Sequence, residues 1–372
     1  MSTNPSFKPL RILHSEAATG WGGQEQYIHR MMLAMRERGH FLEAVCQPHA
    51  KLTERLRQEG FKVHVLPMDG PANYLRGVAR IRGILRQARF DVLNSHSRRD
   101  TMLAGVAARL AGTPLIVRTR HLANRPGSLL SYTIVPHRVT TASDFVRQGL
   151  IERGVPEGHV ATVYPAVELP PLTGQSTLRK ELKLASNDIV VGCVAVMRAL
   201  KGHRELIDAM APLIAERPNV HLVLVGGGSP LFEEIQAYVE SRGLSRRIHM
   251  LGMRNDVPNL LEGFDIFALA TRKEASGTVF VEAGAAGLPV VGTRVDGVPE
   301  MMKEGENGLL VPLDDIPALT AAIRRLVEDP ELRKRMGQAS LAFCRHSGHF
   351  SSDAMVERIE GAYRRWLQEL RK

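Results

Sequence analysis

The stretch T-R-K-E-A-S-G-T-V-F-V-E-A-G-A-A-G-L-P-V-V, residues 271–291, shows the kind of unit from which this 372-residue chain is built. An apolar run at 266–269 precedes it, and a second apolar run at 289–292 closes it. Between the two runs the segment predicts a loop that turns into a helix near Gly277. A strand, a crossover helix and a second strand form the βαβ unit that is typical of parallel sheets.

The same alternation of short apolar runs and longer amphipathic stretches extends in both directions. We predict strands at 11–14, 42–46, 62–66, 91–95, 115–118, 138–141 and 162–164, and then at 189–197, 221–225, 248–251, 266–269, 289–292 and 308–311. Each half of the chain is therefore expected to be a doubly wound α/β domain. The segment A-V-E-L-P-P-L-T-G-Q-S, 166–176, predicts a linker, which gives domains 1–170 and 171–351.

The last predicted helix, about 352–370, follows a complete second sheet. Its apolar residues are spaced for one helical face and comprise Met355, Ile359, Tyr363 and Trp366. Two roles stay open for this segment. It is either a surface helix of the second domain or a return helix that joins the two domains.

The composition excludes several classes of protein. The chain is 44% hydrophobic and 24% charged, as in soluble globular proteins, and no segment has the roughly 18 unbroken apolar residues of a membrane span. Its three cysteines have no C-x-x-C spacing, which argues against a disulfide framework and a zinc site. We expect a cytoplasmic protein without a metal. No zinc-finger, RNP or basic-zipper pattern predicts specific nucleic-acid binding.

Positive charge is concentrated in the first half of the chain. Residues 1–170 contain 23 Lys+Arg and 13 Asp+Glu, whereas the rest contains 49 − 23 = 26 and 39 − 13 = 26. This asymmetry indicates an anionic partner for the first domain. One contributor is a basic amphipathic segment at 74–89, which can lie on an anionic membrane surface or simply pack its apolar stripe (Leu75, Val78, Ile81 and Leu85) on the sheet.

Other cations are expected in loops at the ends of first-domain strands. They are Arg98, Arg99, Arg118, Arg120 and Arg125. Such loops lie at the edge of the sheet where α/β domains bind ligands, so these residues predict attraction of an acidic acceptor. His96 and His121 follow neighbouring strands and are expected at the same edge. Either histidine can instead have only a structural role.

Two glycine-rich turns follow predicted strands. Gly20-Trp21-Gly22-Gly23 precedes a helix beginning near Gln24, and Gly226-Gly227-Gly228 closes the strand at 221–225. Backbone amides in such turns can bind an anion, although glycines there also serve only to turn the chain. The first turn lacks the G-x-G-x-x-G spacing and the acidic second strand end of a dinucleotide site, which disfavours a dehydrogenase.

Two charged pairs lie at the carboxyl edge of the second sheet. Arg198 and Lys201 follow the strand at 189–197, where two cations suit a departing diphosphate. Glu274 lies in the loop that opens the quoted stretch, and Glu282 lies on the helix behind it. A loop carboxylate can accept hydrogen bonds from sugar hydroxyls, and a helical one can bind a ribose diol. Without a ligand role, Arg198 and Lys201 would be solvated cations of a loop, and Glu282 would be a surface residue of its helix.

Taken in order, these motifs resemble the retaining glycosyltransferases of family 4. The matching elements are Gly22-Gly23-Gln24-Glu25, His121, T-A-S-D at 141–144, V-Y-P-A-V at 163–167, Arg198 with Lys201-Gly202, V-G-G-G at 225–228, Glu274 with Glu282, and G-L-P-V-V-G-T-R-V-D-G-V-P-E at 287–300. The sequence departs from the family pattern at Ala275, Ser276 and Asp296 and in the short spacing between Arg198 and Lys201.

The resemblance implies a GT-B fold, with two Rossmann-like domains facing a central cleft and a return helix at 352–372. It implies that His121 lies near the transferred sugar and that Arg198, Lys201 and Glu274 hold the diphosphate and sugar. Further donor contacts are implied for Gly22, Gly23, Gly227, Met253, Arg254, Ser276, Gly277, Thr278, Val279 and Glu282. His96, Arg98, Arg99, Arg120 and Arg125 are candidates on the acceptor side.

The implied function is metal-independent transfer of a hexose or heptose from a UDP-, GDP- or ADP-sugar to an envelope glycan. Lipopolysaccharide core and lipid-linked saccharides are the expected acceptors, and the chain is expected in the cytoplasm, in part on the inner face of the membrane. Two alternatives stay open. A nucleotide-sugar epimerase or hydrolase would use the same donor site without an acceptor, and a binding protein would not turn over.

Overall fold

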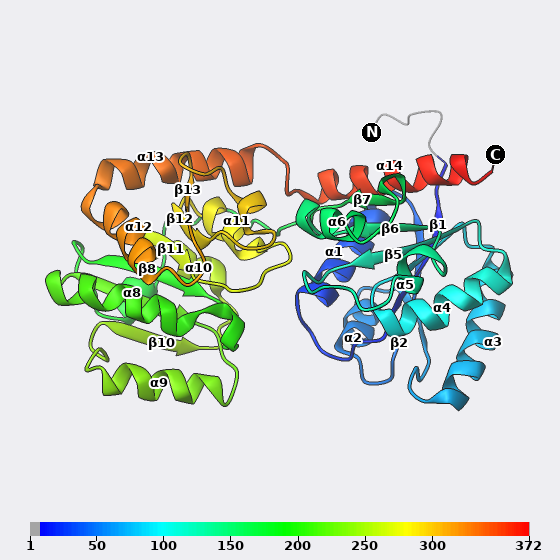
Figure 1. The fold of residues 1–372 in the computed structure, drawn as a ribbon, viewed down its shortest axis with the longest axis horizontal. Helices are drawn as coiled ribbons and strands as arrows, with labels where there is room; N and C mark the ends of the chain where they lie inside the picture. Colours follow the sequence, from blue (N-terminus) through cyan, green and yellow to red (C-terminus); the bar gives the residue numbers. More distant parts are fainter. Residues whose placement is uncertain (1–7, 372) are drawn as a thin grey trace. The chain divides into compact units, whose positions relative to one another are not determined.

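The structure, a computed structural model, describes residues 8–371, which form two compact units (Figure 1). Unit one comprises the chain up to Ala166 together with the segment from Ser351 onward, and unit two comprises Val167–Phe350. The predicted domain boundary at residue 170 lies within the first residues of unit two. Each unit is an α/β structure, as the alternating sequence pattern predicts.

Unit one contains a seven-stranded parallel sheet of order β3-β2-β1-β4-β5-β6-β7. Its strands are β1 (Arg11–Glu16), β2 (Phe41–Cys46), β3 (Lys62–Val65), β4 (Val92–Ser95), β5 (Leu115–Arg120), β6 (Arg138–Thr141) and β7 (Val160–Thr162). The strand order reverses direction between β1 and β4, and ligands of open α/β sheets bind at such a switch point. A ligand site of this unit is therefore expected at the loops after β1 and β4.

Helices cover both faces of this sheet. They are α1 (Gly23–Glu37), α2 (Lys51–Gln58), α3 (Pro71–Ala88), α4 (Arg98–Ala111), α5 (Leu130–Thr133), α6 (Asp144–Ile151) and α14 (Ser352–Glu369), with a 3₁₀ turn at Glu157–His159. Successive strand residues point to opposite faces, so Ile12 packs with α1, α2 and α14, while Leu13 packs with α3 and α4. Both cores consist of buried apolar side chains.

Helix α14, which is red in Figure 1, belongs to the core of unit one. Tyr363 and Trp366 have no exposed surface, and burial of each ring stabilises the unit by roughly 2–3 kcal/mol. The Tyr363 hydroxyl also accepts a hydrogen bond of 2.8 Å from the side-chain amide of Asn94 in β4. The interpretation of this segment as a surface helix of the second domain is therefore wrong, because its apolar face completes the first domain.

Unit two contains a six-stranded parallel sheet of order β10-β9-β8-β11-β12-β13. Its strands are β8 (Ile189–Val194), β9 (Val220–Val225), β10 (Ile248–Gly252), β11 (Ile266–Leu269), β12 (Val290–Thr293) and β13 (Gly308–Val311). Its helices are α7 (Leu178–Glu181), α8 (His203–Glu216), α9 (Leu231–Ser241), α10 (Val257–Leu261), α11 (Thr278–Ala285), α12 (Ile316–Glu328) and α13 (Pro330–Leu341). Shorter turns lie at Ala199–Lys201, Val298–Met301 and Ala342–His346. Here the strand order reverses direction between β8 and β11.

Several predicted strand ends differ from the structure, among them those of β8, β7 and β5. Strand β8 ends at Val194 rather than 197, although the amides of Ala195 and Met197 still donate to Val225 and Gly227 at 2.9 and 3.0 Å. Strand β7 lies two residues earlier than predicted. Strand β5 continues to Arg120, because Ala142 donates to the Arg120 carbonyl and extends the ladder. Within the described part of the chain, no helix is both long and apolar enough to cross a membrane.

Candidate active site

In unit two the glycines after β9 allow a very close approach of two loops. Gly226 and Gly228 both have φ of +144°, and an added Cβ would lie 1.9 Å from the Ala195 carbonyl oxygen and 2.7 Å from that of Met197. Gly227 has room, since its nearest neighbour would be the Met253 side chain at 3.5 Å. The turn therefore needs glycine at 226 and 228 for packing, whereas no close contact requires glycine at 227.

Lys201 and Glu274 form an ion pair at the switch point of the second sheet. Lys201 ends the short turn after β8, and Glu274 lies in the loop after β11. Gly202 fixes the lysine turn against β11, because its φ is +67° and a Cβ there would lie 1.8 Å from the Ala270 carbonyl oxygen. Both side chains are only about one-fifth exposed. The sequence predicted both residues at this edge but not their pairing.

The loop that carries Glu274 is tied down on both sides. Thr271 donates its hydroxyl to the Leu200 carbonyl at 3.0 Å, and the Arg272 amide donates to the same oxygen at 2.8 Å. The Glu274 amide donates to the Asp296 carboxylate at 2.9 Å. Asp296 has φ of +46°, a left-handed conformation that favours glycine. Burial raises the pKa of Asp296, although the hydrogen bond from the Glu274 amide opposes this shift.

Helix α11 begins directly after this loop. Gly277 at its N-cap has φ of +67°, and the half-buried residues Ser276, Thr278 and Val279 surround the first turn. Glu282 lies half-buried on the same helix, which is anchored by Phe280 against Phe267. This places Glu274 and the amino end of α11 on one side of the Lys201 turn. Arg198 is exposed in the same turn.

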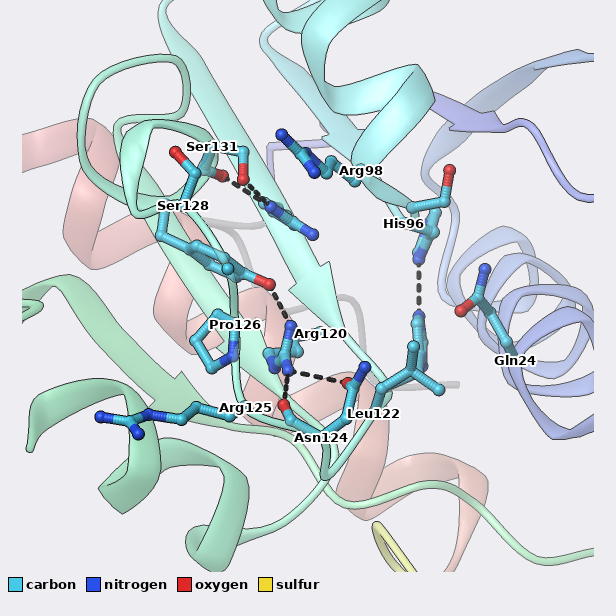
Figure 2. Close-up of a pocket in the computed structure, with 15 residues that line it drawn as sticks. Gln24, His96, Arg98, Arg120, Leu122, Asn124, Arg125, Pro126, Ser128 and Ser131 are labelled. Carbon is cyan, nitrogen blue, oxygen red and sulfur yellow. Dashed lines mark hydrogen bonds between the residues drawn. The ribbon is translucent and has the colours of Figure 1, made fainter. Parts of the chain in front are cut away.

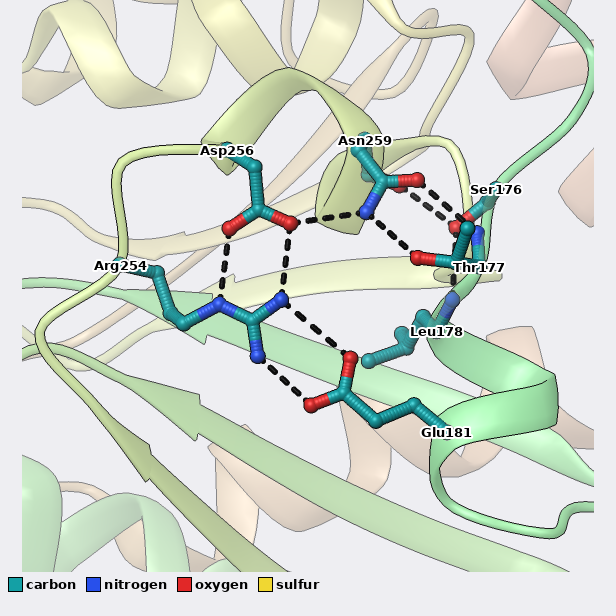
Figure 3. A network of polar contacts seen from close by, with 7 residues as sticks. All are labelled: Ser176, Thr177, Leu178, Glu181, Arg254, Asp256 and Asn259. Atoms are coloured by element: carbon teal, nitrogen blue, oxygen red, sulfur yellow. Dashed lines mark hydrogen bonds and ion pairs between the residues drawn. The ribbon is translucent and has the colours of Figure 1, made fainter.

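Arg254 has a structural partner set that the sequence did not reveal. Its guanidinium donates to Asp256 at 2.8 Å and to Glu181 at 2.6 Å, and Asn259 donates to the same Asp256 carboxylate at 2.9 Å (Figure 3). These contacts raise the pKa of Arg254 and lower that of Asp256. Arg254 thus fixes the β10–α10 loop, from which Met253 projects with 78% of its surface exposed. Its role beside the nucleotide base stays a prediction.

In unit one most of the predicted acceptor-side residues line a single cavity of about 250 Å³ (Figure 2). His96, Arg98, Arg120, His121 and Arg125 all contribute to its wall. Arg99 does not, because its side chain pairs with Asp69 on the surface. The cavity also includes Gln24, which the sequence placed in the first glycine turn, Arg118, and the residues Ser131 and Tyr132, which the sequence analysis did not single out. Arg118 was predicted to end the strand at 115–118 and Arg120 to lie in the loop after it, but β5 continues to Arg120 and both residues are buried.

Three histidines form a stacked, hydrogen-bonded row that ends at this cavity. His14 Nδ1 lies 3.1 Å from His96 Nε2, and His96 Nδ1 lies 3.1 Å from His121 Nε2. Burial lowers the pKa of His14 and of His121 to about 3, and lowers that of His96 as well. All three rings are therefore neutral at pH 7, and each contact has one N–H donor and one nitrogen acceptor. The row fixes which way the His121 ring presents its other nitrogen.

The first glycine turn is already occupied by a carboxylate. The Gly22 amide donates to Glu25 at 2.6 Å in a capping box at the start of α1, whereas Gly23 has open space around it. Beside this turn, buried Glu16 accepts from the Ala18 amide at 2.7 Å and from Gln24. Burial raises the pKa of Glu16 to about 8, and Asp100 contributes further. Of the two predicted glycines, only Gly23 keeps room for a phosphate.

The chain matches two family descriptions that together span most of its length. "Glycosyltransferase Family 4" matches residues 21–169, and "Glycosyl transferases group 1" matches residues 174–342. These segments correspond to most of unit one and unit two, respectively.

Three curated relatives represent the sequence matches. The chain is 31% identical over 188 residues to the N-acetyl-alpha-D-glucosaminyl L-malate synthase of Bacillus anthracis, a match that covers 50% of this chain and 48% of that protein. It is 34% identical to the lipopolysaccharide core biosynthesis glycosyltransferase LpsE of Rhizobium meliloti, over 42% of this chain and 44% of that one. It is 28% identical to the UDP-Gal:alpha-D-GlcNAc-diphosphoundecaprenol alpha-1,3-galactosyltransferase of Escherichia coli, over 67% and 69%. The match thus spans about half the length of the first relative.

Two solved structures share the fold along nearly the whole chain. Anabaena Alr3699/HepE, solved in complex with UDP, superposes with a TM-score of 0.84 at 22% identity, over 96% of this chain and all of that one. A glycosyltransferase from Rickettsia africae superposes with a TM-score of 0.87 at 20% identity, over 97% of this chain and all of that one. The GT-B fold predicted from the sequence is confirmed. The chain belongs to the family 4 glycosyltransferases.

Proposed function

We propose that this protein is a retaining, metal-independent glycosyltransferase that moves a hexose or heptose from a nucleotide-sugar to an envelope glycan. The observation that carries the proposal is the Lys201–Glu274 pair, held by two rigid loops at the switch point of the second sheet. A cation fixed at that edge suits a nucleoside diphosphate as leaving group. Two of the relatives are named as glycosyltransferases, and HepE structures contain UDP and UDP-glucose, which supports a UDP-sugar as the first donor to test.

The residues of unit two divide the chemistry among them. In this proposal Lys201, with the exposed Arg198, stabilises the negative charge that develops on the departing diphosphate. Glu274 releases Lys201 to the phosphate and accepts hydrogen bonds from sugar hydroxyls. The amino end of α11 faces the phosphate, and Glu282 binds the ribose diol. The leaving phosphate then receives the acceptor's proton, so the new bond forms on the face from which the diphosphate departs.

The proposed acceptor is anionic and associated with the cytoplasmic membrane. The first half of the chain has a net charge of +10, and the exposed arginines of α3 add a basic surface next to Leu75, which is 72% exposed. Malate is a dicarboxylate and diphosphoundecaprenol a lipid diphosphate, so the names of two relatives point to anionic acceptors. Lipopolysaccharide core, named for a third, is the first envelope acceptor to test.

The test is donor binding followed by transfer. Thermal unfolding is measured with UDP-, GDP- and ADP-sugars, with and without EDTA, for the wild type and Lys201→Ala. Loss of a charged hydrogen bond, roughly 1.5–3 kcal/mol, should weaken donor binding about 10- to 150-fold. Lys303→Ala, which removes an exposed lysine of the same unit, should bind as the wild type does.

The outcomes separate the proposal from its alternatives. Donor binding that is unchanged in Lys201→Ala would remove the diphosphate role of this lysine. Nucleotide release without any acceptor would indicate a hydrolase, and binding with no turnover on lipopolysaccharide core or lipid-linked saccharides would indicate a binding protein. Loss of binding in EDTA would contradict metal independence.

A further inference from the structure

Two arginines at the end of β5 are buried without a carboxylate partner. Arg118 is 5% exposed and Arg120 is 7% exposed. They are two residues apart on a strand, so their side chains lie on the same face of the sheet. Among the residues that the structure describes, neither forms an ion pair. Asp100 acts on Arg118 only from beyond ion-pair distance, and Arg120 repels it.

The contacts that these guanidiniums do make are neutral. Arg118 donates to the Ser131 carbonyl at 3.1 Å and lies 3.8 Å above the Tyr132 ring, while its Nε has no partner. Arg120 donates to the Tyr132 hydroxyl and to Asn124. Neutral acceptors satisfy N–H groups, but they do not cancel two like charges removed from water, which costs several kcal/mol for each ion.

A shortage of carboxylates does not explain this arrangement. Elsewhere in unit one, Arg99 pairs with Asp69, Arg138 lies 3.0 Å from Glu369, and Arg147 lies 2.6 Å from Glu157. Those arginines are on the surface or partly exposed, where an ion pair is needed least. The two most buried of these arginines are the ones left unpaired. A counter-ion is therefore missing from the β5 edge.

The cavity at this edge has the size and lining for such a counter-ion. Arg118 and Arg120 both line the 250 Å³ cavity, together with the exposed Arg98 and Arg125 (Figure 2). A second cavity of about 410 Å³ shares Arg120 and Arg125 with it. We propose that the first cavity binds an oxyanion of the acceptor, a phosphate or a carboxylate, through Arg118 and Arg120. The assignment of this oxyanion to the acceptor rests on the proposed function, whereas the binding of an anion in the cavity does not.

The arginine side chains, rather than nearby backbone amides, are the donors that would bind the oxyanion. His96 and Ser97, just before α4, also border the cavity, but their amides already donate to the Asp100 carboxylate at 2.9 and 2.7 Å. Guanidinium groups present fixed pairs of N–H donors that match the oxygens of phosphate and carboxylate. The remainder of the acceptor can then extend toward the second cavity, across Arg125.

Calorimetry on the full chain tests the site with inorganic phosphate and with malonate as the carboxylate probe. The titrations use the Lys201→Ala background, which removes the lysine proposed to bind phosphate in unit two. Arg118→Lys and Arg120→Lys keep the positive charge but remove the paired N–H donors of the guanidinium group. Each should weaken binding of the preferred anion about tenfold. Arg147→Gln, which breaks a surface ion pair, should bind within twofold of its parent.

Chemical modification of the wild type provides a test that does not depend on how the variants fold. Phenylglyoxal reacts with accessible arginines, and phosphate or malonate should protect Arg98 and Arg125 while leaving Arg147 reactive. Binding of only one of the two anions supports the site and identifies the source as phosphate or carboxylate. Binding of neither, or binding that the arginine variants do not change, overturns it. Anion binding without any UDP-sugar binding would remove the proposed function and leave this site standing.

Discussion

Replacing Glu16 with glutamine should make unit one less sensitive to rising pH. Glu16 is buried at the end of β1, and its pKa rises from 4.5 to about 8 on folding because of burial and of Asp100. The folded state therefore binds more protons than the unfolded state between these values. The stability that the protonated carboxyl provides is complete below about pH 4.5 and is lost as the pH rises toward 8.

The size of the effect follows from the two pKa values. One proton difference changes the free energy of unfolding by about 1.36 kcal/mol per pH unit, so the wild type should lose about 2.5 kcal/mol between pH 5.5 and 7.5 from this group. Glutamine has nearly the same shape and no charge. It can still accept from Ala18, and a flip of the Gln24 amide lets Gln24 accept where it now donates.

The assay is urea unfolding at several pH values, followed by tryptophan fluorescence. The chain has two tryptophans, Trp21 and Trp366, and both lie in unit one, so the signal reports the unit that contains Glu16. Glu37→Gln, at an exposed position of α1, is the matched control. If the stability difference between Glu16→Gln and wild type is the same at pH 5.5 and 7.5, the buried carboxyl is not protonated on folding and the reasoning fails.

Three further changes test other parts of the structure. Gly226→Ala should destabilise unit two by more than about 2 kcal/mol because of its carbonyl clash and positive φ, whereas Gly227→Ala should stay within about 0.5 kcal/mol; equal effects on thermal unfolding would contradict the packing role. Because burial lowers the pKa of His121 to about 3, its ring should stay neutral from pH 8 down to 4.5, and a histidine NMR titration within that range would refute this. Replacing four exposed α3 arginines with glutamine should weaken binding to anionic vesicles by roughly 4 kcal/mol; a wild type that does not bind anionic vesicles would exclude the membrane role. The four arginines are Arg76, Arg80, Arg82 and Arg86.

The sheets were predictable because periodicity is a local property of the sequence. Strands of both units lie where apolar runs predicted them, and errors of two or three residues occur at ends such as those of β7 and β8. The residue at which a strand ends depends on its hydrogen bonds to the neighbouring strand, and the apolar run that predicts the strand carries no information about that neighbour. The amphipathic segment at 74–89 shows the same limit, since Leu75 was placed in its packed stripe but is exposed, while Gly77 packs against Leu103.

Site residues were predictable where a strand end places them, but their partners were not. Lys201 and Glu274 were each expected at the carboxyl edge of the second sheet, yet their ion pair joins residues 73 positions apart. Arg254 was expected beside a nucleotide base, and its two carboxylates come from a helix and a loop far apart in sequence. The alternation of Arg118 and Arg120 is a strand signal that could have extended the predicted strand at 115–118 to Arg120.

The cations of the two proposed anion sites differ in their partners, and this difference should appear in how the affinity for anions depends on ionic strength. In unit two the cation Lys201 already has the carboxylate of Glu274, so an arriving phosphate must replace a partner and the net gain in charge pairing is small. In unit one Arg118 and Arg120 have neutral partners only, so an oxyanion there pairs charges that were uncompensated. Burial also shields that pairing from added salt, because screening acts mainly on exposed charges. Phosphate binding in unit one should therefore lose less affinity with ionic strength than the attraction of vesicles to the exposed arginines of α3.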